Sequence, residues 1–142
     1  MVFEGRIKMS RWKEKLNDFN KALNRLNEAI IESKDNPLSS TLKDGVIQRF
    51  EFSYELCWKL LKYYLETEGI EEAKSPKSTF REAFKIGLID DGEKWIDMLK
   101  DRNLTSHVYD EEVATVIYNK IVTIYYNQML KICKILNLKD IN

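Results

Sequence analysis

The stretch VIQRFEFSYELCWKLLKYYL, residues 46–65, decides the fold. Its apolar residues recur at about 100° per residue, the period of an α-helix. One face of the predicted helix carries Ile47, Phe50, Tyr54, Cys57, Trp58, Leu61 and Leu65, and a second patch roughly opposite carries Phe52, Leu56 and Tyr63. Two separated apolar faces indicate burial against more than the neighbours within the chain. Glu68-Gly69 ends this helix, with the glycine in the C′ position.

The preceding segment is predicted to be a long helix with a single apolar stripe. Residues at alternating spacings of four and three make up the stripe: Trp12, Leu16, Phe19, Leu23, Leu26 and Ile30. Asn36-Pro37 ends it, because the residue before a proline resists the helical region, and residues 38–41 are predicted to be a connecting loop. Residues 1–9 carry little pattern, which is typical of a frayed end or of an alternative start.

Capping residues mark three later helices. Ser75-Pro76 supplies an N-cap and a proline at the first helical position, and Gly87 ends that short helix. Asp90-Asp91-Gly92 begins the next helix, and Asp110-Glu111-Glu112 begins the last, with two acids complementing the dipole. The last helix has two predicted stripes, one of Val113, Ile117, Ile121, Ile124 and Ile135 and the other of Tyr118, Val122, Tyr126, Met129 and Cys133. We expect one stripe to face the bundle and the other a partner.

Composition agrees with an all-α protein. A length of 142 residues with 44% hydrophobic residues is typical of a single domain, here residues 1–142. Five glycines and two prolines leave few residues that would interrupt a helix. We predict an antiparallel up-and-down bundle of four long helices plus a short helix, which dimerises.

Charge and cysteine usage exclude several functional classes. The 23 basic and 23 acidic residues cancel, so any RNA contact must be local rather than a general basic surface. The sequence has neither a signal-peptide h-region nor an apolar run that could span a bilayer, so we expect a cytoplasmic protein without membrane segments. Cys57 and Cys133 lie in apolar helical patterns without neighbouring ligands, and we predict buried free thiols, no metal site and no cofactor.

The candidate chemistry lies in DRNLTSHVY, residues 101–109, which holds the only histidine of the chain. Arg102 precedes His107 by five positions, so on an uninterrupted helix the two would point about 140° apart. The cap at Asp110 predicts a break that would let them converge beside a helix N-terminus. Because arginine grips phosphate bidentately, Arg102 and His107 form a candidate phosphate-binding or nucleotide-binding site.

Such a site is suited to cleaving RNA without a metal ion. A base takes the proton of the ribose 2′-hydroxyl, an acid protonates the leaving oxygen, and a cation stabilises the charge on phosphorus. His107 could act as the base or as the acid, and Arg102 could stabilise the charge on phosphorus. One histidine cannot carry out both proton transfers at once, so a symmetric dimer that brings two copies together is favoured. A structural interpretation stays open, because a lone histidine near a cap is often an ordinary hydrogen-bonded group.

Other polar residues have simpler interpretations. Thr105 and Ser106 are typical of turn residues, and Tyr109 by itself is typical of a packing or hydrogen-bonding tyrosine. Glu51 and Glu55, four positions apart, could flank a site, but exposed helix carboxylates are usually solvated. Trp12, Trp58 and Trp95 lie on the apolar faces of the predicted helices, which favours packing in the core over stacking on nucleic-acid bases.

Several runs together resemble the nucleotidyltransferase substrate-binding protein family, a branch of the HEPN superfamily. The resemblance covers about Ser10 to Leu136, and the runs that carry it are FEFSYELCWK (50–59), Ser75-Pro76, REAF (81–84), GLI (87–89), Trp95 and MLKDRNLTSHVY (98–109). It implies a helical bundle that dimerises and works with a separately encoded minimal nucleotidyltransferase, often as a heterotetramer.

The related toxin branch, found in HEPN/MNT toxin–antitoxin pairs, implies a more specific chemistry. There an arginine, four residues, a histidine, any residue and a tyrosine mark a metal-independent ribonuclease site made across the dimer. The partner silences that toxin by transferring AMP to the tyrosine. By this resemblance Arg102 and His107 would be catalytic and Tyr109 would be modified. The alternatives are a non-catalytic module that presents a nucleotide to the transferase and a purely structural adaptor.

Overall fold

The computed structural model describes residues 2–141, and side chains from residue 11 onward. Within this range the chain is helical and contains no strand. The elements are α1 (Val2–Asp35), α2 (Ser40–Thr67), α3 (Pro76–Lys85), α4 (Gly92–Leu104), the 3₁₀ turn η1 (Thr105–His107), α5 (Glu111–Lys120), the π-helical turn η2 (Ile121–Tyr125) and α6 (Tyr126–Ile141). Because α5, η2 and α6 are continuous, the described residues form five helices, as the capping signals predicted. The all-α prediction is confirmed. Residues 2–9, which were predicted to be frayed or an alternative start, are helical as part of α1, and their side chains lie outside the described residues.

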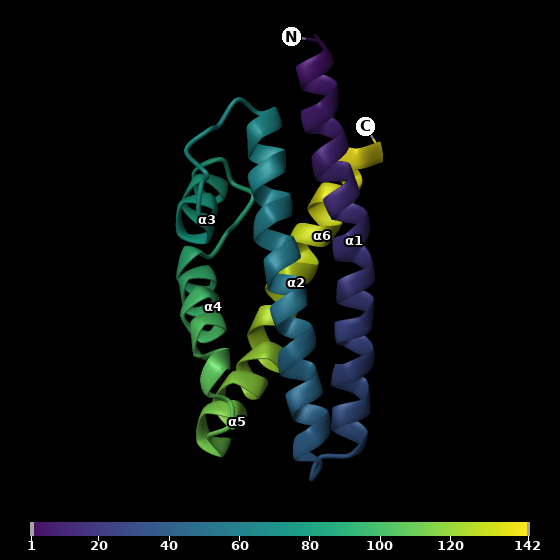
Figure 1. Ribbon diagram of the computed structural model, residues 1–142, viewed down its shortest axis with the longest axis vertical. Helices are drawn as coiled ribbons and strands as arrows, with labels where there is room; N and C mark the ends of the chain where they lie inside the picture. The colour runs from purple at the N-terminus through teal and green to yellow at the C-terminus, as the bar shows by residue number, and fades with distance from the viewer. Residues whose placement is uncertain (1, 142) are drawn as a thin grey trace.

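Helix α2 lies at the centre of the arrangement (Figure 1). It runs antiparallel to α1 on one side and contacts α3 on the other. The short helices α3 and α4 follow each other along that second side, and the last helix crosses behind α2 toward α1. Helix α4, predicted to be one of four long helices, has only 13 residues, whereas α1 has 34 and α2 has 28. Its C-terminal end reaches the region where α5 begins, which places the stretch 101–109 at a corner of the molecule (Figure 1).

Aromatic side chains from nearly every helix meet in the core. Phe50 of α2 stacks on Tyr125 of η2 with ring centroids 5.7 Å apart, and Phe80 packs against Trp95 at 5.0 Å. The predicted stripe of α1 is buried along its whole length: Trp12, Leu16, Phe19, Leu23, Leu26 and Ile30. Each such side chain contributes roughly 1.5–3 kcal/mol on burial, so this stripe is a main source of stability.

Capping residues begin and end several helices close to the predicted positions. Ser75 forms a capping box with Ser78, and Gly69 and Gly87 adopt positive φ angles of 79° and 81° at helix ends. The predicted loop 38–41 is too long, because α2 begins at Ser40. The hydroxyl of Ser39 accepts a hydrogen bond from the Leu42 backbone N–H at 3.2 Å and so acts as N-cap earlier than expected.

The prediction of two separate stripes on the last helix is wrong. Tyr118, Met129 and Cys133 of the proposed partner stripe are buried within the chain, and so are Ile117 and Ile121 of the other stripe. Ile117 and Tyr118 are adjacent in α5 and both buried, so the buried face is already wide before the turn η2. The π-helical turn has i→i+5 hydrogen bonds, which rotates the residues after it relative to a regular helix. Both stripes therefore contribute to one buried face, and the turn adds Tyr125 to it. The two cysteines are free and buried, as predicted.

No helix within the described range has the length and apolar character that crossing a bilayer requires.

Candidate functional site

Arg102 lies in the last turn of α4 and reaches toward α2. Its Nη1 donates a hydrogen bond to Thr105 Oγ1 at 3.2 Å, and the same hydroxyl donates to the Arg102 carbonyl at 2.7 Å. The guanidinium also faces two carboxylates of α2, with Nη2 3.6 Å from Glu55 Oε1 and Nη1 4.0 Å from Glu51 Oε2. Both ion pairs are longer than hydrogen bonds, so the guanidinium keeps donor capacity for a further anion. The side chain is 29% exposed and therefore accessible to one.

Asp101, the residue before Arg102, faces the opposite way, into the core. It is only 6% exposed, accepts a hydrogen bond from the Tyr125 hydroxyl and forms an ion pair with Lys120 Nζ at 3.2 Å. Burial raises the pKa of Tyr125, and the hydrogen bond to Asp101 raises it further. The last turn of α4 is thus held from two sides, by α2 through Arg102 and by the last helix through Asp101.

His107 and Tyr109 lie on an exposed corner after the helix break. Helix α4 ends at Leu104 and η1 follows, so the predicted interruption between Arg102 and His107 is confirmed. His107 Nδ1 lies 3.4 Å from the Tyr109 hydroxyl, and the two rings meet edge to face with centroids 5.9 Å apart. Tyr109 is 82% exposed. The imidazole of His107 therefore lies beside an accessible phenol.

The predicted convergence of Arg102 with His107 is not seen as a direct contact. Among residues 11–141, no hydrogen bond or ion pair joins the two side chains. Tyr109 instead borders a pocket of about 480 Å³ that Leu38 and Lys43 also line. The N-terminus of α5 beside it is already capped, because Asp110 accepts hydrogen bonds from the backbone N–H groups of Glu112 and Val113. Arg102 therefore faces α2, while Tyr109 borders this pocket.

Sequence reasoning missed the surroundings of Arg102. Glu51 and Glu55 were predicted to be solvated, yet both are only partly exposed and face the guanidinium. Trp58, predicted to be a core residue, is only partly buried and donates its indole N–H to Glu55 Oε2 at 3.1 Å. Their four-residue spacing placed the two acids on one helix face, but nothing local links them to an arginine about fifty positions away. Thr105 does lie in a turn as predicted, and it is also buried.

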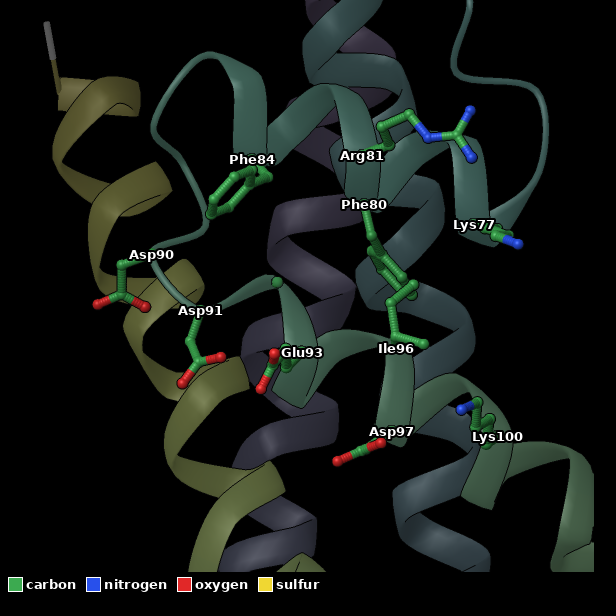
Figure 2. Close-up of a pocket in the computed structure, with 11 residues that line it drawn as sticks. Lys77, Phe80, Arg81, Phe84, Asp90, Asp91, Glu93, Ile96, Asp97 and Lys100 are labelled. Carbon is green, nitrogen blue, oxygen red and sulfur yellow. The ribbon is translucent and has the colours of Figure 1, made fainter.

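A second pocket lies between α3 and α4, away from this corner (Figure 2). Its volume is about 710 Å³, and Phe80, Phe84 and Ile96 contribute apolar surface. Figure 2 shows acidic side chains of residues 90–93 on one side and the basic Arg81 on the other. Neither Arg102, His107 nor Tyr109 lines it, so this pocket is separate from the candidate chemistry.

Comparisons with known proteins agree with the helical architecture. Residues 14–137 match the family described as nucleotidyltransferase substrate binding protein like. A Haemophilus influenzae protein named probable ribonuclease HepT is 42% identical over 88 residues, which cover 59% of this chain. The chain spans about 60% of the length of that curated relative.

Two solved structures share the fold. One, from Thermus thermophilus, is 35% identical with a TM-score of 0.74, and the match covers 83% of this chain and 98% of that one. The other, from Haemophilus influenzae, is described as revealing the fold of a substrate binding domain of a nucleotidyltransferase. It is 32% identical with a TM-score of 0.78, covering 86% of this chain and 98% of that one.

Proposed function

The chain belongs to the nucleotidyltransferase substrate binding protein family, and from this premise we propose that it is the helical partner subunit of a separately encoded minimal nucleotidyltransferase. The description of the Haemophilus influenzae structure supports a role beside such an enzyme. Surface chemistry supports an interface: Phe52 is 62% exposed and lines a groove of about 540 Å³ between α1 and α2 together with Leu56. Two copies of this chain and two transferase subunits would make a heterotetramer around a homodimer.

We further propose that the corner after α4 is a ribonuclease site. The observation that carries this proposal is the exposed pair of His107 and Tyr109 directly after a helix end that fixes Arg102. In RNA cleavage Arg102 would stabilise the charge on phosphorus, and His107 would transfer one of the two protons. The second proton needs another group, from a second copy in a symmetric dimer or from this chain. The name of the Haemophilus influenzae relative supports ribonuclease activity.

Tyr109 is the proposed acceptor of AMP. Its hydroxyl oxygen would attack the α-phosphorus of ATP bound to the partner, pyrophosphate would leave, and the phenolic proton would pass to a base. The exposure of Tyr109 gives a second enzyme access to the oxygen. The attached phosphodiester would sit within a few ångströms of His107 Nδ1, adding negative charge and bulk where an RNA phosphate has to bind. Modification would therefore silence the ribonuclease.

A growth experiment tests this function. A bacterial host would express the wild-type chain, His107→Ala, or the wild-type chain together with its nucleotidyltransferase, with total RNA analysed from each culture. We expect growth arrest and RNA cleavage from the wild type alone, relieved both by the substitution and by the partner. Ser106→Ala, an exposed neighbour in the same turn, is the matched control and should stay toxic. Normal growth in every culture, with expression confirmed, would contradict the ribonuclease proposal.

A nucleotide-presenting module is the second candidate function. The pocket beside Tyr109, lined also by Lys43, favours it, because a lysine next to an exposed tyrosine could hold a nucleotide phosphate for the partner. The two functions differ in the effect of His107→Ala, which should abolish cleavage in a ribonuclease but mainly weaken nucleotide affinity in a presenting module. Isothermal titration with AMP and ATP would measure that affinity. A purely structural adaptor would show neither effect.

A further inference from the structure

Glu55 is placed unlike an ordinary surface carboxylate. One of its oxygens, Oε2, accepts the indole N–H of Trp58 at 3.1 Å, and the other, Oε1, lies 3.6 Å from Arg102 Nη2. Trp58 is one helical turn further along α2, so the carboxylate is oriented by its own helix before any ligand arrives. Its side chain is 41% exposed, so the carboxylate is oriented and accessible at the same time.

The distance between Glu55 and Arg102 leaves room for chemistry. At 3.6 Å the two groups attract each other without sharing a hydrogen bond, and Nη1 of the arginine already donates to Thr105. A phosphate bound to the free N–H groups of the guanidinium would lie next to the carboxylate. In RNA the 2′-hydroxyl is attached to C2′, the neighbour of the carbon that carries the 3′-oxygen of that phosphate, so it would be within reach of Glu55.

We infer that Glu55 is the general base of the site and that His107 is its general acid, which rests on the ribonuclease function proposed above. The Glu55 carboxylate takes the proton of the 2′-hydroxyl, and the 2′-oxygen forms a bond to phosphorus. The bond from phosphorus to the 5′-oxygen breaks, and that oxygen takes a proton from the His107 imidazolium. The products are a 2′,3′-cyclic phosphate and a 5′-hydroxyl, and exchange with water resets both groups.

In this assignment the two proton transfers are made by different residue types, a carboxylate as the base and a histidine as the acid. A carboxylate is an acceptor when ionised and an imidazolium is a donor, so the two can hold opposite protonation states at one pH, which a single histidine cannot. Glu51 fits the role less well. Its oxygen is 4.0 Å from Arg102, and in the described part of the chain no hydrogen bond orients its carboxylate.

The test compares two RNA substrates with the purified chain. The first is a mixed-sequence oligoribonucleotide, and the second is the same pool with sulfur replacing one bridging 5′-oxygen. A thiolate leaves without being protonated, so the second substrate does not need the acid. We expect His107→Ala to lose about 100-fold or more in kcat/KM on the first substrate and to recover to within about tenfold of wild type on the second. Glu55→Gln should lose about 100-fold on both substrates.

Two measurements separate a base from a residue that only positions Arg102. The limb of the pH–rate profile that reports the essential base should vanish in Glu55→Gln, whereas a positioning role would leave both limbs in place. Glu55→Asp should restore part of the rate, since it keeps a carboxylate. Glu51→Gln should lose less than about tenfold, and Glu66→Gln, on the same helix three turns away, is the control for charge. Circular dichroism and urea unfolding would confirm that each variant is folded.

The outcomes distinguish this inference from the function on which it rests. A wild type that cleaves neither substrate overturns both. A wild type that depends on Arg102 and His107 while Glu55→Gln stays within about threefold overturns only the assignment of Glu55. Recovery of Glu55→Gln, rather than His107→Ala, on the sulfur substrate would also overturn it, because Glu55 would then be the acid.

Discussion

The last turn of α4 and the corner that follows it differ sharply although they are adjacent in the chain. In the turn, Asp101 is 6% exposed and bonded to two residues of the last helix, and Arg102 is flanked by α2. On the corner, Tyr109 is 82% exposed, and within the described part of the chain its hydroxyl has one polar contact, 3.4 Å from His107 Nδ1. The turn has the features of a scaffold that fixes a cation, and the corner those of a reactive surface. Substitutions in the first should cost stability, and those in the second should leave stability nearly unchanged, whatever they do to activity or its regulation.

Asp101→Ala should have the largest effect on stability. It removes the acceptor of the buried Tyr125 hydroxyl and the partner of Lys120, and leaves a small cavity. We expect a loss of about 3 kcal/mol in the free energy of unfolding, measured by urea denaturation. Asp97→Ala, on the same helix but exposed, is the matched control and should change stability by less than about 0.5 kcal/mol. Equal effects of the two substitutions would show that the scaffold does not depend on Asp101.

The buried tyrosines predict how stability depends on pH. Burial raises the pKa of Tyr125, Tyr54 and Tyr64 above the ordinary value, for Tyr64 to about 12. Below about pH 10 both folded and unfolded chains keep these protons. Above it the unfolded chain releases them first, so the free energy of unfolding falls as pH rises, by up to about 1.4 kcal/mol per pH unit for each tyrosine.

Tyr125→Phe measures how much of the alkaline decrease in the free energy of unfolding is due to Tyr125, the tyrosine that donates to Asp101. The variant should be less stable at neutral pH, because Asp101 loses a donor, yet its stability should fall less steeply above pH 10. Urea denaturation at several alkaline pH values would give both slopes. Parallel slopes for wild type and variant would mean that Tyr125 ionises in the folded chain as easily as in the unfolded one.

The sequence predicted the helices better than it predicted the scaffold. Periodicity and caps identify local features, so the stripe of α1, the N-cap at Ser75 and the break before His107 were all confirmed. Tyr125 lay on neither predicted stripe of the last helix, because a regular 100° period cannot anticipate a π-helical turn.

The contacts of the site were harder to predict than its residues. Arg102, His107 and Tyr109 were identifiable from spacing and resemblance, but which groups surround them depends on packing between distant segments. Glu55 meets Arg102 only because α4 lies against α2, and no local pattern encodes that approach. Arg102 and Tyr109 likewise face different ways because the 3₁₀ turn lies between them. A sequence pattern can predict that the helix is interrupted there, but not the direction that the chain takes afterwards.

Thr105→Val tests the link between scaffold and corner. The hydroxyl of Thr105 accepts from Arg102 Nη1 and donates to the Arg102 carbonyl, and the side chain is buried. Valine has nearly the same shape without the hydroxyl, so we expect a loss of about 1 kcal/mol in urea denaturation. Thr105→Ser keeps the hydroxyl and should retain most of the stability. If valine and serine cost the same, packing rather than hydrogen bonding holds the turn.

Tyr109→Phe should have the smallest effect on stability and the clearest effect on regulation. The phenol is exposed, and its hydroxyl has a single, long polar contact among residues 11–141, so removing the oxygen should change the free energy of unfolding by less than about 0.5 kcal/mol. It also removes the proposed acceptor atom, so the variant should stay toxic when the nucleotidyltransferase is co-expressed. Mass spectrometry should find AMP added to the wild type but not to the variant. If Tyr109→Phe destabilises the chain as much as Thr105→Val does, the corner belongs to the scaffold instead. A hydroxyl that is only an exposed AMP acceptor should contribute almost nothing to the free energy of unfolding.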